Sequence, residues 1–319
     1  MHLRRFFISA LAAVIVSGTT NAVIAQGYPE RPVEIIVPWS PGAITDVLGR
    51  ALAKELTINL GQSFIIVDKA GATSAIGTAA VARANHDGYS LLFTAAVSVT
   101  VVPLINKEAG YELKAFTPIC QTFKNEMAIV VRPDSPYKSV GDLVNAAKAK
   151  PGGITYGHLG IGSIPHLAMV EFSQVAKAEF NAIPYKGDAD IKQQVLGGQI
   201  DFGVMVLSSA AGSDLRILGI FSGQRNPAIP DVATIKEQGF AVTPSSFGGL
   251  IAPTGIPAEV KRKLSEACKA AALAESYAKL AKSVFQPNDY YADGESFADS
   301  LDKDVAEKSR LLQSLGELK

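Results

Sequence analysis

Residues 33–56, VEIIVPWSPGAITDVLGRALAKEL, contain the strand-to-helix transition that decides the fold. The apolar run 33–38 predicts a short strand. One face of the helix after it collects apolar side chains, at Leu48, Ala51, Leu52 and Leu56. Between them lie the single tryptophan of the chain, two prolines and a glycine. We expect Thr45 or Asp46 to cap the helix.

The same alternation of strand and helix continues along the chain. Apolar runs predict further strands at 63–68, 89–96, 127–135, 153–160, 180–187, 200–206, 215–221 and 247–253. Ser139 and Asp142 have capping-box spacing at the start of a helix over 139–150. A helix beginning at Pro257 and another over 294–317 close the chain. Alternation of this kind predicts parallel sheets covered by helices, and 319 residues favour two lobes over one core.

The amino-terminal residues are typical of a secretory signal. Arg4 and Arg5 precede an apolar run over 6–16, and a polar stretch leads to a cleavage site after Ala25. Residues 1–25 are therefore expected to be removed and the mature protein to be periplasmic, by general export in preference to the twin-arginine route. No later stretch of the sequence is long and apolar enough to span a membrane.

Charge and cysteine content exclude several classes of partner and site. Without Arg4 and Arg5 the 30 basic residues become 28, against 30 acidic ones, so neither nucleic acid nor an anionic membrane is expected to bind. Histidine and cysteine spacing predicts no metal site, and no motif predicts a cofactor. Cys120 and Cys268 are expected to be buried free thiols, and a disulfide between them is the alternative.

Four loops rich in Gly, Ala, Ser and Thr follow predicted strands, at 39–46, 71–77, 94–100 and 160–166. Ligands of open parallel sheets collect at the carboxyl ends of strands, where helix N-termini present free N–H groups. Small residues let these backbone amides approach a ligand closely. The four loops together predict an anion site made of neutral donors.

Several segments resemble one known family. They include YPERPVEIIVPWSPGAITDVLGRALAKEL (28–56), DGYSLL (87–92), GHLGIGSIPHLAMVEF (157–172) and IPYKGDADIKQQVLGGQID (183–201). The chain resembles the Bug proteins, extracytoplasmic solute receptors of tripartite tricarboxylate transporters, from about residue 28 to its end. The resemblance implies the α/β fold of a type II periplasmic binding protein, with a hinge and a central ligand cleft. It places lobe 1 at 26–124 plus 244–319 and lobe 2 at 125–243.

The resemblance also implies a receptor that is not an enzyme. It would capture a small organic acid (a mono-, di- or aromatic carboxylate) between the lobes without a cofactor and deliver it to the membrane permease subunits. The receptor itself is expected to be a monomer. Carried onto this chain, the ligand-binding positions are Trp39, Ser40, Gly42, Ala43, Thr45, Asp46, Gly71, Thr73, Ser74, Thr94, Ala96, Ser98, Gly160, Gly162, Ser163, His166 and Tyr185.

The chain departs from the family pattern at positions that shape the pocket. Ala43 and the pair Thr73-Ser74 stand where the family prefers glycine, and Trp39 stands where it has another aromatic residue. An aspartate that is common in the family near Met205 is missing. Its loss removes a partner for an ammonium group, which favours a plain organic acid over an amino acid.

Other interpretations of these residues stay open at this point. Trp39 packs between the lobes or walls the ligand, and Asp46 caps a helix or contacts the ligand. Ser163 and His166 lie three apart at a helix start, which favours capping; an exported hydrolase using both is the alternative function. Lys186 is a solvated or hinge-facing charge, or it meets a second carboxylate of the ligand.

Overall fold

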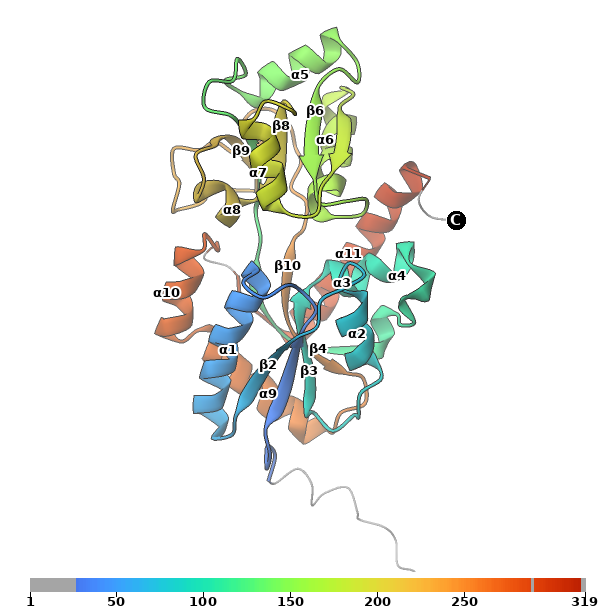
Figure 1. Cartoon of the computed structure of the whole chain (residues 1–319). Helices are drawn as coiled ribbons and strands as arrows, with labels where there is room; N and C mark the ends of the chain where they lie inside the picture. The colour runs from blue at the N-terminus through green and yellow to red at the C-terminus, as the bar shows by residue number, and fades with distance from the viewer. Residues whose placement is uncertain (1–26, 288–289, 317–319) are drawn as a thin grey trace, which may run out of the picture.

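Two α/β lobes, each built on its own sheet, make up the protein in a computed structural model that describes residues 27–287 and 290–316 (Figure 1). The expected signal at 1–25 lies outside these residues. Lobe 1 holds a sheet of order β11-β4-β10-β3-β1-β2. Its strands are β1 Val33–Val37, β2 Phe64–Asp68, β3 Ser90–Ala95, β4 Phe116–Lys124, β10 Phe247–Pro253 and β11 Ala292–Asp293.

Lobe 2 holds a sheet of order β7-β6-β8-β5-β9. Its strands are β5 Met127–Val131, β6 Thr155–His158, β7 Asn181–Pro184, β8 Phe202–Val206 and β9 Arg216–Phe221. In both sheets three neighbouring strands run parallel, and antiparallel strands complete the sheet. The expected two-lobe α/β fold is confirmed, while the lobe boundaries at 124/125 and 243/244 stay a prediction.

Two crossing segments connect the sheets, one between β4 and β5 and one before β10. They touch where the Asn125 N–H donates to the Ser246 carbonyl at 2.7 Å. Each crossing strand continues into a buried strand of the other lobe's sheet, so the connection is short on both sides. This double crossing places the carboxyl ends of β1 and β6 and the loops that follow them between the two lobes.

The helices of lobe 1 cover both faces of its sheet. They are α1 Ile44–Leu60, α2 Ala75–Ala82, α3 Val97–Thr100, α4 Val102–Ile105, the 3-10 turns η1 Lys107–Ala109 and η2 Leu113–Ala115, α9 Ala258–Ala272 and α10 Glu275–Ser283. Leu48, Leu52 and Leu56 of α1 are fully buried against β1, as the spacing predicts, and Ala51 is half-buried. Burying each leucine contributes about 1.5–3 kcal/mol.

The helices of lobe 2 are α5 Val140–Ala149, α6 Ile164–Ala176, α7 Asp188–Leu196 and α8 Leu207–Ala211. The predicted capping box at the start of α5 is confirmed. The Ser139 Oγ accepts from the Asp142 N–H at 3.1 Å, and the Asp142 carboxylate accepts from the Ser139 N–H at 2.9 Å. Two of the four unsatisfied amides at this helix start are thereby paired.

The last helix, α11 Gly294–Ser314, contacts both lobes. Phe297 and Leu301 are buried in a core cluster of lobe 1, whereas Leu312 is buried in the core of lobe 2. Figure 1 shows α11 rising from lobe 1 to the side of α6, and the Gln174 amide of α6 donates to the Ser314 hydroxyl at 3.2 Å. The helix therefore links the two lobes outside the hinge.

A buried ion pair fixes α11 to the second crossing segment. Lys308 and Asp304, each 1% exposed, pair with one another. Lys308 also donates to the Ser245 carbonyl at 3.0 Å, and the Thr100 hydroxyl donates to Asp304 at 2.6 Å. Each charge is thus paired and hydrogen-bonded, which a buried ion pair requires.

The cysteines correct one expectation. Cys120 of β4 and Cys268 of α9 form a disulfide, so the expectation of free thiols is wrong and the alternative holds. The physical reason is packing, since α9 lies on β4 and brings the two Cα atoms to 6.4 Å, within bridging range. Sequence spacing of 148 residues carries no signal of this proximity.

Candidate functional site

A cavity of about 480 Å³ lies between the lobes and is lined by loops of both. Seven of the positions expected to bind ligand line it. These are Trp39, Gly42, Ala43, Thr45, Thr73, Gly162 and Ser163. The first five come from lobe 1 and the last two from lobe 2, so the cavity joins the loops that follow β1, β2 and β6.

Trp39 forms one wall of this cavity. Its indole is half-buried and packs against two buried clusters, one within lobe 1 and one that lies mainly in lobe 2. The indole N–H donates to the Thr94 hydroxyl at 3.1 Å, and Thr94 is paired with Ser98 at 2.7 Å. Trp39 therefore packs against the buried clusters and lines the cavity, and its contact with a ligand stays a prediction. Thr94 and Ser98 are fully buried behind it and support the wall without lining the cavity.

The first loop ends in a helix start that differs from the expectation. Helix α1 begins at Ile44, and Ala43 is the N-cap residue, without a side-chain hydrogen bond. The expectation that Thr45 or Asp46 is the N-cap is wrong. The Ala43 N–H donates to the Ser40 carbonyl at 3.1 Å, and this turn starts the helix earlier in the sequence. Asp46 reaches back and accepts from the Gly42 N–H at 2.8 Å.

This bond decides which amides face the cavity unpaired. The Gly42 N–H is occupied by Asp46, while the first-turn amides of Ile44, Thr45 and Asp46 have no acceptor among the described residues. Ile44 and Thr45 line the cavity, so the α1 N-terminus presents free donors and the positive end of the helix dipole to it. Such an arrangement favours an anion.

The charge of Asp46 is balanced within lobe 1. Asp46 is 3% exposed and lies 2.7 Å from the Arg50 guanidinium, which also contacts Asp68 at 2.5 Å. Burial and the Asp46 charge raise the pKa of Asp68. Arg50 therefore neutralises part of a carboxylate that would otherwise oppose an anion at the helix start.

The second loop has an unusual backbone. Ala72, Thr73 and Ser74 all adopt positive φ, at 46°, 52° and 75°, after Gly71 at 133°. Such conformations are costly for residues with a side chain and cluster at functional sites. Thr73 is exposed and lines the cavity. Ser74 is buried, and its hydroxyl has no hydrogen-bond partner within the described residues.

The loop of lobe 2 is held by Ser163 and His166. Ser163 is the N-cap of α6: its hydroxyl accepts from the His166 N–H at 3.4 Å and donates to the Gly160 carbonyl at 2.7 Å. The Gly162 N–H donates to His166 Nδ1 at 3.3 Å, and the imidazole stacks on His158 with ring centroids 4.7 Å apart. Burial, and to a lesser degree His158, lower the pKa of His166 to about 4.

These contacts confirm the capping interpretation of the pair. The Ser163 hydroxyl donates to a backbone carbonyl, and within the described residues no hydrogen bond joins it to the His166 ring, so this pair lacks the activated serine that a hydrolase would need. Gly162 needs to be glycine, because its φ is 76° and a Cβ would lie 2.8 Å from the Ile105 side chain of lobe 1. The two lobes meet closely at this loop.

Ten of the expected positions do not line the cavity. They are Ser40, Asp46, Gly71, Ser74, Thr94, Ala96, Ser98, Gly160, His166 and Tyr185. Most of them support the lining residues from behind, as Asp46, Thr94 and His166 do. Tyr185 lies apart, with Lys186 and Asp190, at a shallow hollow on the surface of lobe 2. Lys186 therefore does not line the cavity, in agreement with a solvated charge.

Sequence reasoning missed the rest of the lining. Polar side chains come from the start of α7, from the start of α8 and from the two crossing segments, at Asp188, Ser208, Ser209, Asn125 and Ser246. Apolar ones include Val97, Val101, Val102, Ile105, Ile161 and Ile164. Asp188 follows β7 within a few residues, and the two serines follow β8. Because ligands of parallel sheets bind at the carboxyl ends of strands, these positions could have been predicted from the sequence.

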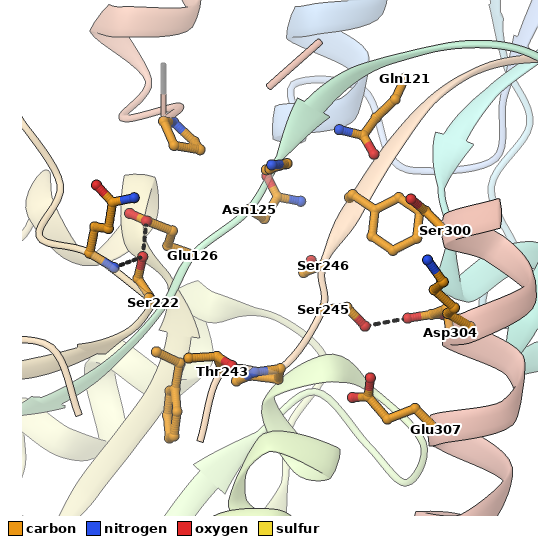
Figure 2. A pocket seen from close by; sticks show the side chains of 18 of the residues that line it. Gln121, Asn125, Glu126, Ser222, Thr243, Ser245, Ser246, Ser300, Asp304 and Glu307 are labelled. Atoms are coloured by element: carbon orange, nitrogen blue, oxygen red, sulfur yellow. Dashed lines mark hydrogen bonds between the residues drawn. The ribbon is translucent and has the colours of Figure 1, made fainter. Parts of the chain in front are cut away.

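A second hollow of about 560 Å³ lies on the other side of the hinge (Figure 2). Asn125 and Ser246 line both cavities, so the crossing segments form the partition between them. The Glu126 carboxylate accepts from the Ser222 hydroxyl at 2.6 Å and from the Asn226 amide at 2.7 Å. Figure 2 shows the contact of Ser222 with Glu126 and, on the opposite wall, the contact of Ser245 with Asp304.

Neither a metal site nor a membrane span is found within the described residues. No cluster of three histidine, cysteine or acidic side chains there could hold a metal ion. No helix over 27–287 and 290–316 has the length and apolar character needed to cross a bilayer.

Known proteins are similar to this chain in sequence and architecture. Protein BugT of Bordetella pertussis is 30% identical over 292 residues, covering 87% of this chain and 89% of BugT. The periplasmic binding protein BugD superposes with a TM-score of 0.78 and 29% identity over 92% of this chain and all of BugD. Rpa4515 of R. palustris, solved with adipate, superposes with a TM-score of 0.80 and 25% identity, covering 91% of this chain and 98% of Rpa4515.

The family model described as the tripartite tricarboxylate transporter family receptor matches residues 48–317. The match begins within α1, at Leu48, includes both crossing segments and α11, and so spans both lobes. The chain therefore belongs to the family of tripartite tricarboxylate transporter receptors, together with the Bug proteins.

Proposed function

We propose that this protein is a periplasmic receptor that closes its two lobes on a small organic carboxylate and delivers it to a membrane permease. The observation that carries the proposal is the α1 N-terminus, where Ile44 and Thr45 line the interlobe cavity and their amides have no acceptor among the described residues. A carboxylate there would accept charge-assisted hydrogen bonds and meet the positive end of the helix dipole. The adipate in Rpa4515 supports a carboxylate as ligand of a related receptor.

Contacts from both lobes would drive closure. Ser163 of lobe 2 and Thr45 of lobe 1 face the same cavity, so a bound ligand touches both lobes only when they approach. A ligand shifts such an equilibrium only by its greater affinity for the closed form. The delivery step and the permease subunits are inferred from family membership.

A thermal-shift screen of small organic acids tests the binding step. A binder at a hundredfold excess over its Kd is expected to add about 2.7 kcal/mol to the free energy of unfolding and to raise Tm. If no carboxylate raises Tm, the proposal is wrong.

One pair of variants tests the role of the helix start. Ile44→Pro removes the first free amide, and proline suits the first position of a helix after an extended residue such as Ala43. Losing one hydrogen bond to a charged group is expected to cost about 1.5–3 kcal/mol of binding free energy. Ile44→Ala, which keeps the amide and loses the same side chain, is the matched control and should bind nearly as the wild type does.

Localisation and assembly have separate tests. Amino-terminal sequencing of the periplasmic fraction is expected to begin at Gln26, since cleavage is predicted after Ala25. Sedimentation of the mature protein is expected to show a monomer. In cells, deletion of the receptor should abolish uptake of the acid identified by the screen, and re-expression should restore it.

A further inference from the structure

Asp188 is the single ionisable side chain among the described residues that line the interlobe cavity. It is the first residue of α7 and follows β7 through a short connection. The remaining polar lining consists of hydroxyl, amide and backbone groups, and none of the described lining residues is a lysine, arginine or histidine. Within the described lining, the one group that can carry a formal charge is therefore an acid on lobe 2, while lobe 1 contributes neutral donors.

The environment of Asp188 leaves this charge poorly compensated. Its Oδ1 atom is buried and has no hydrogen-bond partner in the described structure. Burial raises the pKa of the carboxyl, and hydrogen bonding from the Ser209 hydroxyl and the Val206 backbone only partly opposes the rise. No cationic side chain contributes to that balance. Its position at the start of α7 provides only the partial charge of a helix end.

A ligand with one carboxylate and no cation would add a second negative charge to this cavity. The α1 amides can hold one carboxylate, but a second carboxylate on the ligand would meet Asp188 without a lysine or arginine to pair with. Like charges in a partly desolvated site disfavour each other strongly. An ammonium group on the ligand would instead pair with Asp188 and neutralise a charge that is costly to bury.

We propose that the cavity selects an amino acid in its zwitterionic form, with the carboxylate at the α1 N-terminus and the ammonium group at Asp188. This inference rests on the proposed function. It overrides the expectation, drawn from the absence of an aspartate near Met205, that the ligand is a plain acid. Met205 is fully buried in the core of lobe 2, whereas Asp188 reaches the end of the same strand from α7.

The proposal also names ligands that the receptor rejects. A dicarboxylate such as the adipate of Rpa4515 would place its second carboxylate in a cavity whose one charge is negative. The apolar side chains at Val97, Val101 and Ile105 suit an amino acid with an apolar side chain. The selected class is therefore an amino acid with no second acidic group.

Matched ligand pairs test the proposal on the mature protein. Calorimetric titration would compare leucine with isocaproate, phenylalanine with hydrocinnamate, and γ-aminobutyrate with butyrate, and would include adipate and succinate. The acids within each pair share a carbon skeleton and differ in the ammonium group. At least one amino acid is expected to bind about tenfold or more tightly than its partner, the order of a desolvated charge pair.

Variants assign the preference to the residue. In Asp188→Asn the preference for the amino acid is expected to fall to within about threefold, because the charge pair is lost. Asp188→Ser is a second variant with the same expectation. Asp190→Asn, which alters an exposed acid of the same helix outside the cavity, is the control and should keep the wild-type preference.

The outcomes separate the two proposals. If plain acids or dicarboxylates bind the wild type more tightly than every amino acid, this inference is wrong and the carboxylate receptor stands. An unchanged preference in both Asp188 variants would likewise overturn it. If no acid of any kind binds, the proposed function fails and this inference fails with it.

Discussion

Acid should destabilise this protein through His166, and the effect can be worked out from its surroundings. The ring is 8% exposed, its Nδ1 accepts from the Gly162 N–H, and it stacks on His158. Burial and the neighbouring His158 lower its pKa from 6.5 to about 4. Protonation would charge a buried ring and remove the acceptor that holds Gly162 at the cavity.

The sign follows from proton linkage. Between pH 6.5 and pH 4 the unfolded chain binds a proton at this position and the folded chain does not. The stability associated with the neutral ring is therefore complete above pH 6.5 and is lost as the pH falls toward 4. A difference of two to three pH units corresponds to about 3 kcal/mol in total, of which about 2 kcal/mol is lost at pH 5.

Urea unfolding at pH 7.5 and at pH 5 measures this loss of stability. His166→Asn keeps an acceptor near the Nδ1 position but cannot be protonated, so its free energy of unfolding should fall about 2 kcal/mol less over the same interval. Burial also lowers the pKa of His158, which leaves a residual slope in the variant. His86→Asn, at an exposed site, is the control. Equal losses of stability in the wild type and in His166→Asn would show that protonation of His166 does not destabilise the folded protein.

Three further sets of substitutions test the links that hold the fold and the backbone of the first loop. Replacing Cys120 and Cys268 by serine removes a link across 148 residues and should lower the free energy of unfolding by about 2–5 kcal/mol in urea; a loss below about 1 kcal/mol would contradict this. Lys308→Met leaves the buried Asp304 without its cation and should lower the free energy of unfolding by about 3–5 kcal/mol. Adding Asp304→Asn to this variant should restore part of the loss, and no recovery would argue against the ion pair. Gly42→Ala places a side chain at φ 80° in open space, so thermal melting should show a loss of about 1–2 kcal/mol from backbone strain and not from a clash.

Much of the fold follows from patterns that are local in sequence. The periodic leucines of α1 and the capping box of α5 are where the spacing predicts them. Both patterns depend on residues within one or two helical turns, so the sequence contains all the information that they need. The order of strands in each sheet and the path of α11 across both lobes depend on distant contacts, such as Leu312 in the core of lobe 2.

The candidate site is predictable only in part. Trp39, Thr73 and Gly162 line the cavity as expected, because loops after parallel strands gather at one edge of a sheet. The role of Asp46 could not be predicted from its place in the sequence. Helix α1 begins two residues before Asp46, and its carboxylate therefore reaches back to the Gly42 amide. Asp188 was missed because an acid at a helix start has an ordinary structural explanation, and its unpaired oxygen is visible only in three dimensions.

The first-turn amides of α1 are proposed to hold the ligand carboxylate. Amide NMR of the deuterated, ¹⁵N-labelled protein during titration with a binding acid observes these groups themselves. The Ile44 and Thr45 amides are expected to show the largest shifts and to saturate together with Gly162 of lobe 2. If binding saturates without shifting these amide signals and instead shifts those of residues in the second hollow, such as Arg225 and Lys303, the α1 amides do not hold the ligand.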